Sequence, residues 1–198
     1  GTGAGNISFS GKLDGTSAGN QTLGLTAGTG NVVFTGAVGS GTRVGAITIN
    51  SATDVTAAAV TAASLVQSAG TGTTRLNAAV DTDAAAGVNI AAGTIVLNST
   101  ITTANSGVVT LAAGAGGLTI AAAGDISADA AVSLTGAGTV KISTAAGEQR
   151  SEAYLKINPR GKVPALVADG EVILENVAIM AFVAGAHPKS GIWPKETM

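Results

Sequence analysis

Gly107-Val-Val-Thr-Leu-Ala-Ala-Gly-Ala-Gly-Gly-Leu-Thr-Ile120 is the stretch that decides the fold of this protein. It contains two apolar-x-apolar doublets, Val109/Leu111 and Leu118/Ile120, separated by alanine and glycine. An apolar residue at every second position is typical of a short strand with one buried face. Glycine between two such strands lets the chain turn sharply. We therefore interpret the stretch as two short buried strands joined at a corner.

The same doublet recurs along the first 146 residues, with a less regular stretch in the middle. Short and long steps between doublets alternate, and one of each covers roughly 21–25 residues, the spacing of a solenoid coil. The pattern predicts a mainly β fold, a right-handed parallel β-helix (solenoid) of about six coils. The doublets are Ile7/Phe9, Leu23/Leu25, Val32/Phe34, Ile47/Ile49, Val88/Ile90, Ile95/Leu97, Val109/Leu111, Leu118/Ile120, Val132/Leu134 and Val140/Ile142.

The alanine-rich run from Val55 to Gln67 is the part of this region where a helix competes with a strand. β-Branched residues such as Val60, Thr61 and Val66 lose side-chain freedom in a helix and favour a pleated strand. We therefore interpret the run as strand.

The composition changes abruptly near residue 147. Residues 1–146 hold 24 of the 29 glycines and contain no proline, histidine, tryptophan, tyrosine, methionine or glutamate, all of which occur after that point. A single domain rarely divides its residue types in this way. The sequence therefore predicts two units of different origin, a β-solenoid repeat segment over 1–146 and a truncated α/β tail over 147–198.

Runs in the first unit resemble the β-strand repeats of large bacterial surface proteins. Asp54-Val-Thr-Ala-Ala-Ala-Val-Thr61 and Gln67-Ser-Ala-Gly-Thr-Gly-Thr-Thr74 carry the likeness, which covers about residues 5–144. Filamentous-haemagglutinin-like adhesins and autotransporter passengers are the nearest class. The resemblance implies a non-catalytic structural or adhesive segment on the surface of, or secreted by, a Gram-negative-type bacterium. A host or surface glycan or protein is the partner that it implies.

Other features bear on location and association. No basic segment followed by an apolar core is present, so we expect no signal peptide on this chain. The absence of cysteine fits export through an oxidising compartment. The open ends of a solenoid expose unpaired backbone groups, and self-association through these ends is expected.

The second unit carries a more specific motif. Asn158-Pro-Arg-Gly-Lys-Val-Pro-Ala-Leu166, followed by Glu175-Asn-Val-Ala-Ile179, resembles the N-terminal thioredoxin-like domain of bacterial glutathione S-transferases. The likeness covers about residues 148–194. Its implied ligand is glutathione.

The local pattern of this tail predicts a helix, a β-hairpin and a second helix. The first helix spans 151–156, and the hairpin joins 163–167 to 172–174 through Asp169-Gly170, a strong turn signal. The second helix spans 175–186. The free edge of the hairpin could pair with another chain, which is a second route to self-association. We expect four side chains of this helix to face inward, those of Val177, Ile179, Met180 and Val183.

The resemblance implies a set of glutathione-binding residues on the tail. In the family, the Val-Pro peptide is cis and its valine pairs with the glutathione main chain, which here assigns Val163 and Pro164. Glu175 and Asn176 would receive the γ-glutamyl end, because a helix N-terminus offers free N–H groups to a carboxylate and Glu175 can pair with the ammonium. Lys162 would face the glycyl carboxylate.

The first β-α-β unit of that family, with its catalytic residue, has no counterpart before Glu148. Half of a thioredoxin fold cannot assemble its central sheet, and a lone hairpin is marginal in water. We therefore expect no catalytic residue, no metal and no resident cofactor, and no enzyme activity. The alternative function is a glutathione-binding module derived from a transferase, with the solenoid as its carrier.

Charge and composition exclude further classes of protein. The net charge is −2 and the ten basic residues are scattered, whereas nucleic-acid proteins need a clustered basic surface. No run of 18 apolar residues is present, so no membrane span is expected. Three explanations stay open for the junction near 147: a fusion of two sequences, a tail that caps the solenoid, or a hairpin edge that pairs with another chain.

Asp81 and Asp83 are two positions apart, so in a strand both carboxylates lie on the same side. They are either a calcium pair, an acid pair of a polysaccharide-cleaving enzyme, or residues of a solvated turn, and we favour the turn. Asp125 and Asp129 are likewise interpreted as turn residues.

Several other residues have structural interpretations. The segment 114–117 is not a phosphate loop, because no Gly-Lys-Ser/Thr follows it. His187 is interpreted as a helix cap and Trp193 as a packing anchor. Threonines two positions apart form either an ordered hydroxyl face for ice or glycan or ordinary strand positions, and we favour the latter. These threonines are Thr71, Thr73, Thr100 and Thr102.

Overall fold

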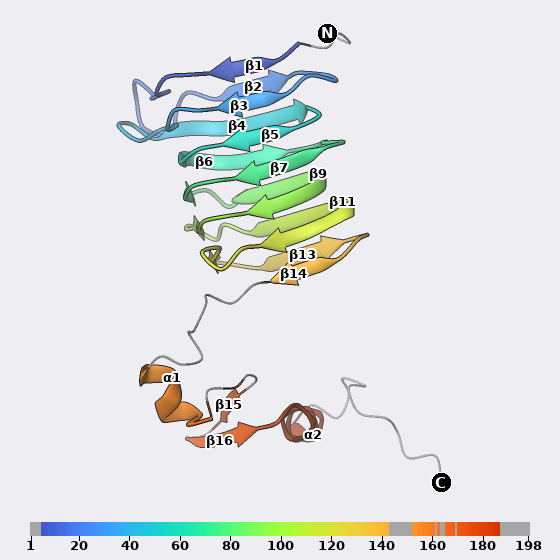
Figure 1. The fold of residues 1–198 in the computed structure, drawn as a ribbon. Coiled ribbons are helices and arrows are strands. Elements are labelled where there is room, and N and C mark those ends of the chain that lie inside the picture. The colour runs from blue at the N-terminus through green and yellow to red at the C-terminus, as the bar shows by residue number, and fades with distance from the viewer. Residues whose placement is uncertain (1–4, 143–151, 161, 163–164, 169, 187–198) are drawn as a thin grey trace. The chain divides into compact units, whose positions relative to one another are not determined.

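The computed structural model describes residues 5–142, 152–160, 162, 165–168 and 170–186. The chain divides into two compact units, Gly1–Ala145 and Ala146–Met198. Figure 1 shows the strands of the first unit stacked in successive turns. In the described part of the chain, no helix is both long and apolar enough to cross a membrane.

The first unit is a parallel β-solenoid of about six turns, which confirms the predicted fold class. Fourteen strands join into one sheet in which the neighbouring strands run parallel. The strands are β1 (Ile7–Phe9), β2 (Leu23–Thr26), β3 (Val32–Phe34), β4 (Val44–Ser51), β5 (Val55–Ala57), β6 (Val60–Gln67), β7 (Thr73–Leu76), β8 (Val80–Thr82), β9 (Val88–Leu97), β10 (Ile101–Thr103), β11 (Val109–Ile120), β12 (Ile126–Ser127), β13 (Val132–Gly136) and β14 (Val140–Ile142).

Strand pairing forms three parallel ladders that run along the solenoid. The first ladder contains β1, β3, β5 and β7, the second halves of β9 and β11, and β14. The second contains β2, β4, the end of β6, the first halves of β9 and β11, and β13. The third contains the start of β6, then β8, β10 and β12. In the third ladder Val80 pairs with Ile101, 21 residues later, as the predicted coil length requires.

The predicted doublets supply about half of the core. Val109, Leu111 and Leu118 are fully buried, and each stacks in register on the equivalent residue of the preceding turn. At the last described turn, in contrast, Val132 and Val140 are 48% and 41% exposed, because β13 and β14 are paired on one side.

The third ladder was missed by the doublet pattern. Its strands place a valine or isoleucine and then a threonine inward, as in Val80/Thr82 and Ile101/Thr103, and both threonines are buried. A search for two apolar residues does not recognise this pattern, although threonine is a good strand residue. Each turn therefore has three strands rather than the two that the doublets indicate.

The alanine-rich run forms β5 and β6, which confirms its interpretation as strand. Inward positions of β6 include Ala62 and Leu65, which are buried in the common core. Stacking between the turns above and below therefore determines the conformation of this run, since parallel partners are present on both sides.

The second unit contains the predicted helix, hairpin and helix: α1 (Glu152–Ile157), β15 (Ala165–Ala168), β16 (Glu171–Leu174) and α2 (Asn176–Ala186). The hairpin is antiparallel, with Ala168 opposite Glu171. One prediction was wrong: Val177 is 68% and Met180 39% exposed, whereas Ile179 and Val183 are half-buried. In the described part of this unit, α2 packs on the two short hairpin strands, and these cover only one side of the helix.

Candidate functional site

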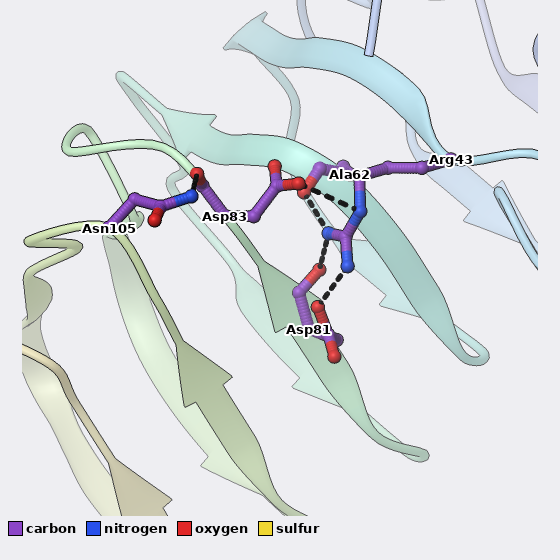
Figure 2. Close-up of polar contacts among 5 residues, drawn as sticks. All are labelled: Arg43, Ala62, Asp81, Asp83 and Asn105. Carbon is purple, nitrogen blue, oxygen red and sulfur yellow. Dashed lines mark hydrogen bonds and ion pairs between the residues drawn. The ribbon is translucent and has the colours of Figure 1, made fainter. Parts of the chain in front are cut away.

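The carboxylates of Asp81 and Asp83 surround the guanidinium of Arg43 (Figure 2). Nη2 of Arg43 lies 2.5 Å from Oδ1 of Asp81, and Nε lies 3.2 Å from Oδ2 of Asp83. The Arg43 side chain is only 22% exposed, against 51% for Asp81 and 40% for Asp83. The guanidinium therefore lies between the two carboxylates, less exposed than either, and offsets one of their two negative charges.

Arg43 also donates to the backbone of two neighbouring turns. Its Nη1 lies 2.6 Å from the carbonyl oxygen of Ala62 in β6 and 3.1 Å from that of Asp81 in β8. The amide of Asn105 donates to the carbonyl oxygen of Asp83 at 2.8 Å and extends the network by another turn (Figure 2). We name these five residues the Arg43 clamp, because they join consecutive turns through side chains.

The clamp corrects the interpretation of Asp81 as a turn residue. Asp81 lies in the middle of β8 and points outward, and Asp83 directly follows that strand. Both carboxylates do point to one side, as their spacing predicts, but a guanidinium lies where a bound cation would have to be. Among the described residues no group of three or more histidine, cysteine, aspartate or glutamate side chains is placed to hold a metal ion. The geometry is that of a structural ion pair.

Sequence reasoning did not identify Arg43. Its one available signal was rarity, since Arg43 is one of four basic residues before residue 147. Its partner Asp81 is 38 positions away, a separation that only the stacking of turns can bridge.

Asp125 and Asp129 lie in the loops that flank β12, consistent with their interpretation as turn residues. Oδ1 of Asp125 accepts from the N–H of Ile126 at 2.9 Å, and Oδ2 of Asp129 accepts from the N–H of Ser106 at 2.7 Å. Both carboxylates are thus used to hold backbone groups.

The threonine pairs do not form one hydroxyl face. Thr73 begins β7 in the first ladder, whereas Thr102 lies in β10 in the third ladder. Thr71 and Thr100 precede these strands and are exposed. Two different faces of the solenoid therefore carry the hydroxyl groups.

The glycine segment 114–117 lies within β11, at the corner between its two halves. Gly117 has a φ of 80°, and a Cβ there would collide with the carbonyl oxygen of Thr139. Glycine therefore serves the corner and the close approach of the next turn. His187 and Trp193 lie outside the described residues.

In the tail, α1 is closed by hydrogen bonds to one carbonyl group. The hydroxyl of Tyr154 and the amide of Asn158 both donate to the carbonyl oxygen of Lys162 at 2.6 Å. Asn158 is 2% exposed, and its side-chain oxygen accepts from the N–H of Arg160 at 3.1 Å. The asparagine of the Asn-Pro motif therefore orders the loop that leads into the hairpin.

The structure locates three of the five proposed glutathione-binding residues. Lys162 lies between α1 and β15, Glu175 follows β16, and Asn176 is the first residue of α2. Val163 and Pro164 lie outside the described residues. Glu175 has a φ of 77° and its carboxylate lies 3.4 Å from the guanidinium of Arg160, a partner that sequence reasoning did not identify.

Comparison with known proteins locates the similarity in the same part of the chain. Residues 130–185 match the glutathione S-transferase N-terminal domain. The match begins before the expected residue 148 and includes β13 and β14, the strands of the last described turn of the solenoid. The C-terminal part of the chain is thus similar to a glutathione-S-transferase domain, and no solved structure matches the chain significantly.

The similar proteins share a short segment with this chain. A maleylacetoacetate isomerase of Dictyostelium discoideum is 37% identical over 49 residues, which cover 25% of this chain and 22% of that protein. Protein LigF of Sphingobium is 48% identical over 44 residues, covering 22% and 17%, and a Pseudomonas aeruginosa maleylacetoacetate isomerase is 40% identical over 47 residues, covering 23% and 22%. The chain therefore spans about a fifth of the length of these relatives.

Proposed function

We propose that the solenoid is a non-catalytic structural segment, a rigid spacer of a bacterial surface or secreted protein. The observation that supports this function is the continuity of the three parallel ladders, whose strands stack in register along the solenoid around an apolar core. Each turn buries its apolar residues against its neighbours, so rigidity and length both follow from the number of turns.

The polar groups of the first unit support a structural role. Arg43 joins Asp81 and Asp83 to the backbone of neighbouring turns, and Asp125 and Asp129 hold loop N–H groups. These charged groups therefore already have structural partners.

Removal of one complete turn tests the spacer function. Ile101 and Ile126 occupy equivalent positions, so deletion of Ile101–Asp125 joins Thr100 to Ile126 in register. We expect a folded, protease-resistant solenoid that is shorter by about 4.8 Å in small-angle X-ray scattering. Deletion of Ile101–Ala112 is the control, because it removes only part of a turn and should make the solenoid residues that follow the deletion sensitive to protease. Unfolding by the in-register deletion would contradict the proposal.

A second function, glutathione binding by the tail, is favoured by the match to the glutathione S-transferase N-terminal domain. The residues present fit the ligand chemically. Within the described residues, the backbone hydrogen bonds of α2 begin with the N–H of Ile179 donating to the carbonyl oxygen of Glu175, so the N–H groups before Ile179 can serve a carboxylate. The Glu175 carboxylate, 3.4 Å from Arg160, is 75% exposed and can receive an ammonium group. Lys162 would add a positive charge for a second carboxylate.

Titration of the full chain with reduced glutathione, followed by amide NMR, tests this second function. We expect saturable shifts at the start of α2 that are lost in Glu175→Ala. Glu171→Ala is the matched control, since Glu171 is an exposed glutamate at the start of β16. Absence of shifts at millimolar glutathione would exclude the second function.

A further inference from the structure

A groove of about 250 Å³ opens on the outer side of the first ladder. It crosses three successive turns, because the outward residues Val33, Thr56 and Arg75 are aligned in register across β3, β5 and β7. Its complete lining is Asn31, Val33, Asp54, Thr56, Thr73 and Arg75.

Backbone hydrogen bonds fix the polar side chains on one side of the groove. Oδ1 of Asn6 accepts a hydrogen bond from the N–H of Asn31 at 2.9 Å. In the same way, Oδ1 of Asn31 accepts from the N–H of Asp54 at 3.0 Å. Oδ1 of Asp54 then accepts from the N–H of Thr73 at 2.7 Å. Each side chain is thus held by the next turn through one of its two polar atoms. The second polar atom of Asn31 and of Asp54 is not needed for this stacking.

Gly72 makes room for the Asp54 carboxylate. A Cβ at Gly72 would collide with Oδ1 of Asp54, so any other residue there would displace the carboxylate from the groove. The position of Asp54 in the groove therefore depends on a glycine in the next turn.

Arg75 supplies the donors of the groove. Its side chain is exposed, and within the described residues no hydrogen bond or ion pair engages its guanidinium. Its five N–H donors are therefore available to a ligand. This differs from Arg43, whose guanidinium already makes four polar contacts, with Asp81, Asp83 and Ala62.

We propose that this groove binds a neutral saccharide unit of a glycan. It combines one carboxylate and one guanidinium, so it carries no net charge, and it offers both acceptors and donors as the paired hydroxyls of a sugar require. Val33 adds an apolar contact for the C–H groups of a sugar ring. A phosphate or nucleic acid would require clustered basic residues, and Asp54 repels an anion. Glycan binding goes beyond the spacer function, which depends on the ladders alone.

Amide NMR titration of the full chain tests the proposal. The probes are neutral oligosaccharides of glucose, galactose, mannose and N-acetylglucosamine, with trigalacturonate as the charged comparison. We expect at least one neutral probe to bind with a Kd on the order of 1 mM and to shift the amides of the groove residues. Arg75→Leu should weaken this binding at least about tenfold without changing the thermal unfolding temperature.

Lys141→Leu is the matched control. Lys141 is an exposed basic residue in the same outward row, aligned with Arg75 through Val96 and Thr119, but it lies outside the groove. Its substitution should leave the affinity unchanged. Thr56→Ala is a second variant that should weaken binding.

Three results would each overturn the proposal: no shift of groove amides with any neutral probe, unchanged affinity in both groove variants, or binding of trigalacturonate alone. The in-register deletion of Ile101–Asp125 leaves the groove intact. Failure of glycan binding is thus distinguishable from failure of the spacer function.

Discussion

Nη2 of Arg43 lies 2.5 Å from Oδ1 of Asp81, although 38 positions separate the two residues in the chain. The contact reaches across β6 to β8, so it joins turns that the backbone ladder connects only through an intermediate strand. A guanidinium is well suited to this position, because its planar donors can serve carboxylates and carbonyl groups at once.

Arg43→Leu should destabilise the solenoid by about 1–2 kcal/mol, because it leaves two carboxylates without a cation and one half-buried carbonyl without a donor. The estimate is modest since Asp81 and Asp83 are partly exposed. Chemical denaturation measures the effect. Arg75→Leu removes the same charge from an arginine that has no ion pair with the described residues, and it should change the free energy of unfolding by less than about 0.5 kcal/mol. Equal effects of the two substitutions would show that the clamp does not stabilise the fold.

Gln67 places a carboxamide in an otherwise apolar column. It stacks in register between Ile49 and Ile90 and is 2% exposed. Its Oε1 accepts from the Thr74 hydroxyl at 2.7 Å, whereas its Nε2 has no hydrogen-bond partner among the described residues. The double variant Gln67→Leu/Thr74→Val removes both buried polar groups and should raise the free energy of unfolding by about 1–2 kcal/mol.

The single variants separate the two contributions to this effect. Thr74→Val alone leaves both polar atoms of the Gln67 amide without a protein partner, so it should destabilise by about 1 kcal/mol. Urea titration of the three variants checks the prediction. A double variant less stable than the parent would mean that the carboxamide is satisfied in solution.

Gly39 should not tolerate alanine. Its φ is 69°, and a Cβ would collide with the carbonyl oxygen of Thr61 in the next turn, so we expect a loss of about 2–4 kcal/mol. Gly24 is the control, because a Cβ there meets no atom within 4 Å and its φ is not in the left-handed region. Thermal unfolding compares the two variants. A similar melting temperature for Gly39→Ala and Gly24→Ala would contradict the expected collision.

Asp14 should contribute stability that depends on pH. The N–H of Gly41 donates to Oδ1 of Asp14 at 2.8 Å, and this hydrogen bond lowers the pKa of the Asp14 carboxyl below its ordinary value of 3.8. Desolvation raises the pKa by a smaller amount. The N–H of Thr42 and the charge of Lys12 lower it further by small amounts. A folded-state pKa below the unfolded value stabilises the fold above pH 3.8, and this contribution is lost as the pH falls through the folded-state pKa. Asp14→Asn keeps an acceptor but cannot titrate. The stability difference between the parent and this variant should therefore shrink on acidification, and a constant difference would contradict the prediction.

The local pattern of the sequence predicted much of the fold. Doublets such as Val109/Leu111 identified inward positions because side chains alternate along a strand, and that alternation holds wherever the strand lies. The hairpin of the tail followed from a two-residue turn signal, and the strand interpretation of Val55–Gln67 from its β-branched residues. The candidate glutathione residues followed from a motif, and their role stays a proposal.

By itself, then, the sequence determined a parallel solenoid of about six turns followed by an α+β tail, because period and turn chemistry are properties of short segments. The tertiary structure alone decided the third ladder, the Arg43 clamp, the carboxamide of Gln67 in the core and the groove beside Arg75. Each depends on which residue of one turn lies over which residue of the next, and turns of unequal length hide that register. Val60 to Val80 spans 20 residues and Ile101 to Ile126 spans 25, so residues that meet in space have no fixed separation in the chain.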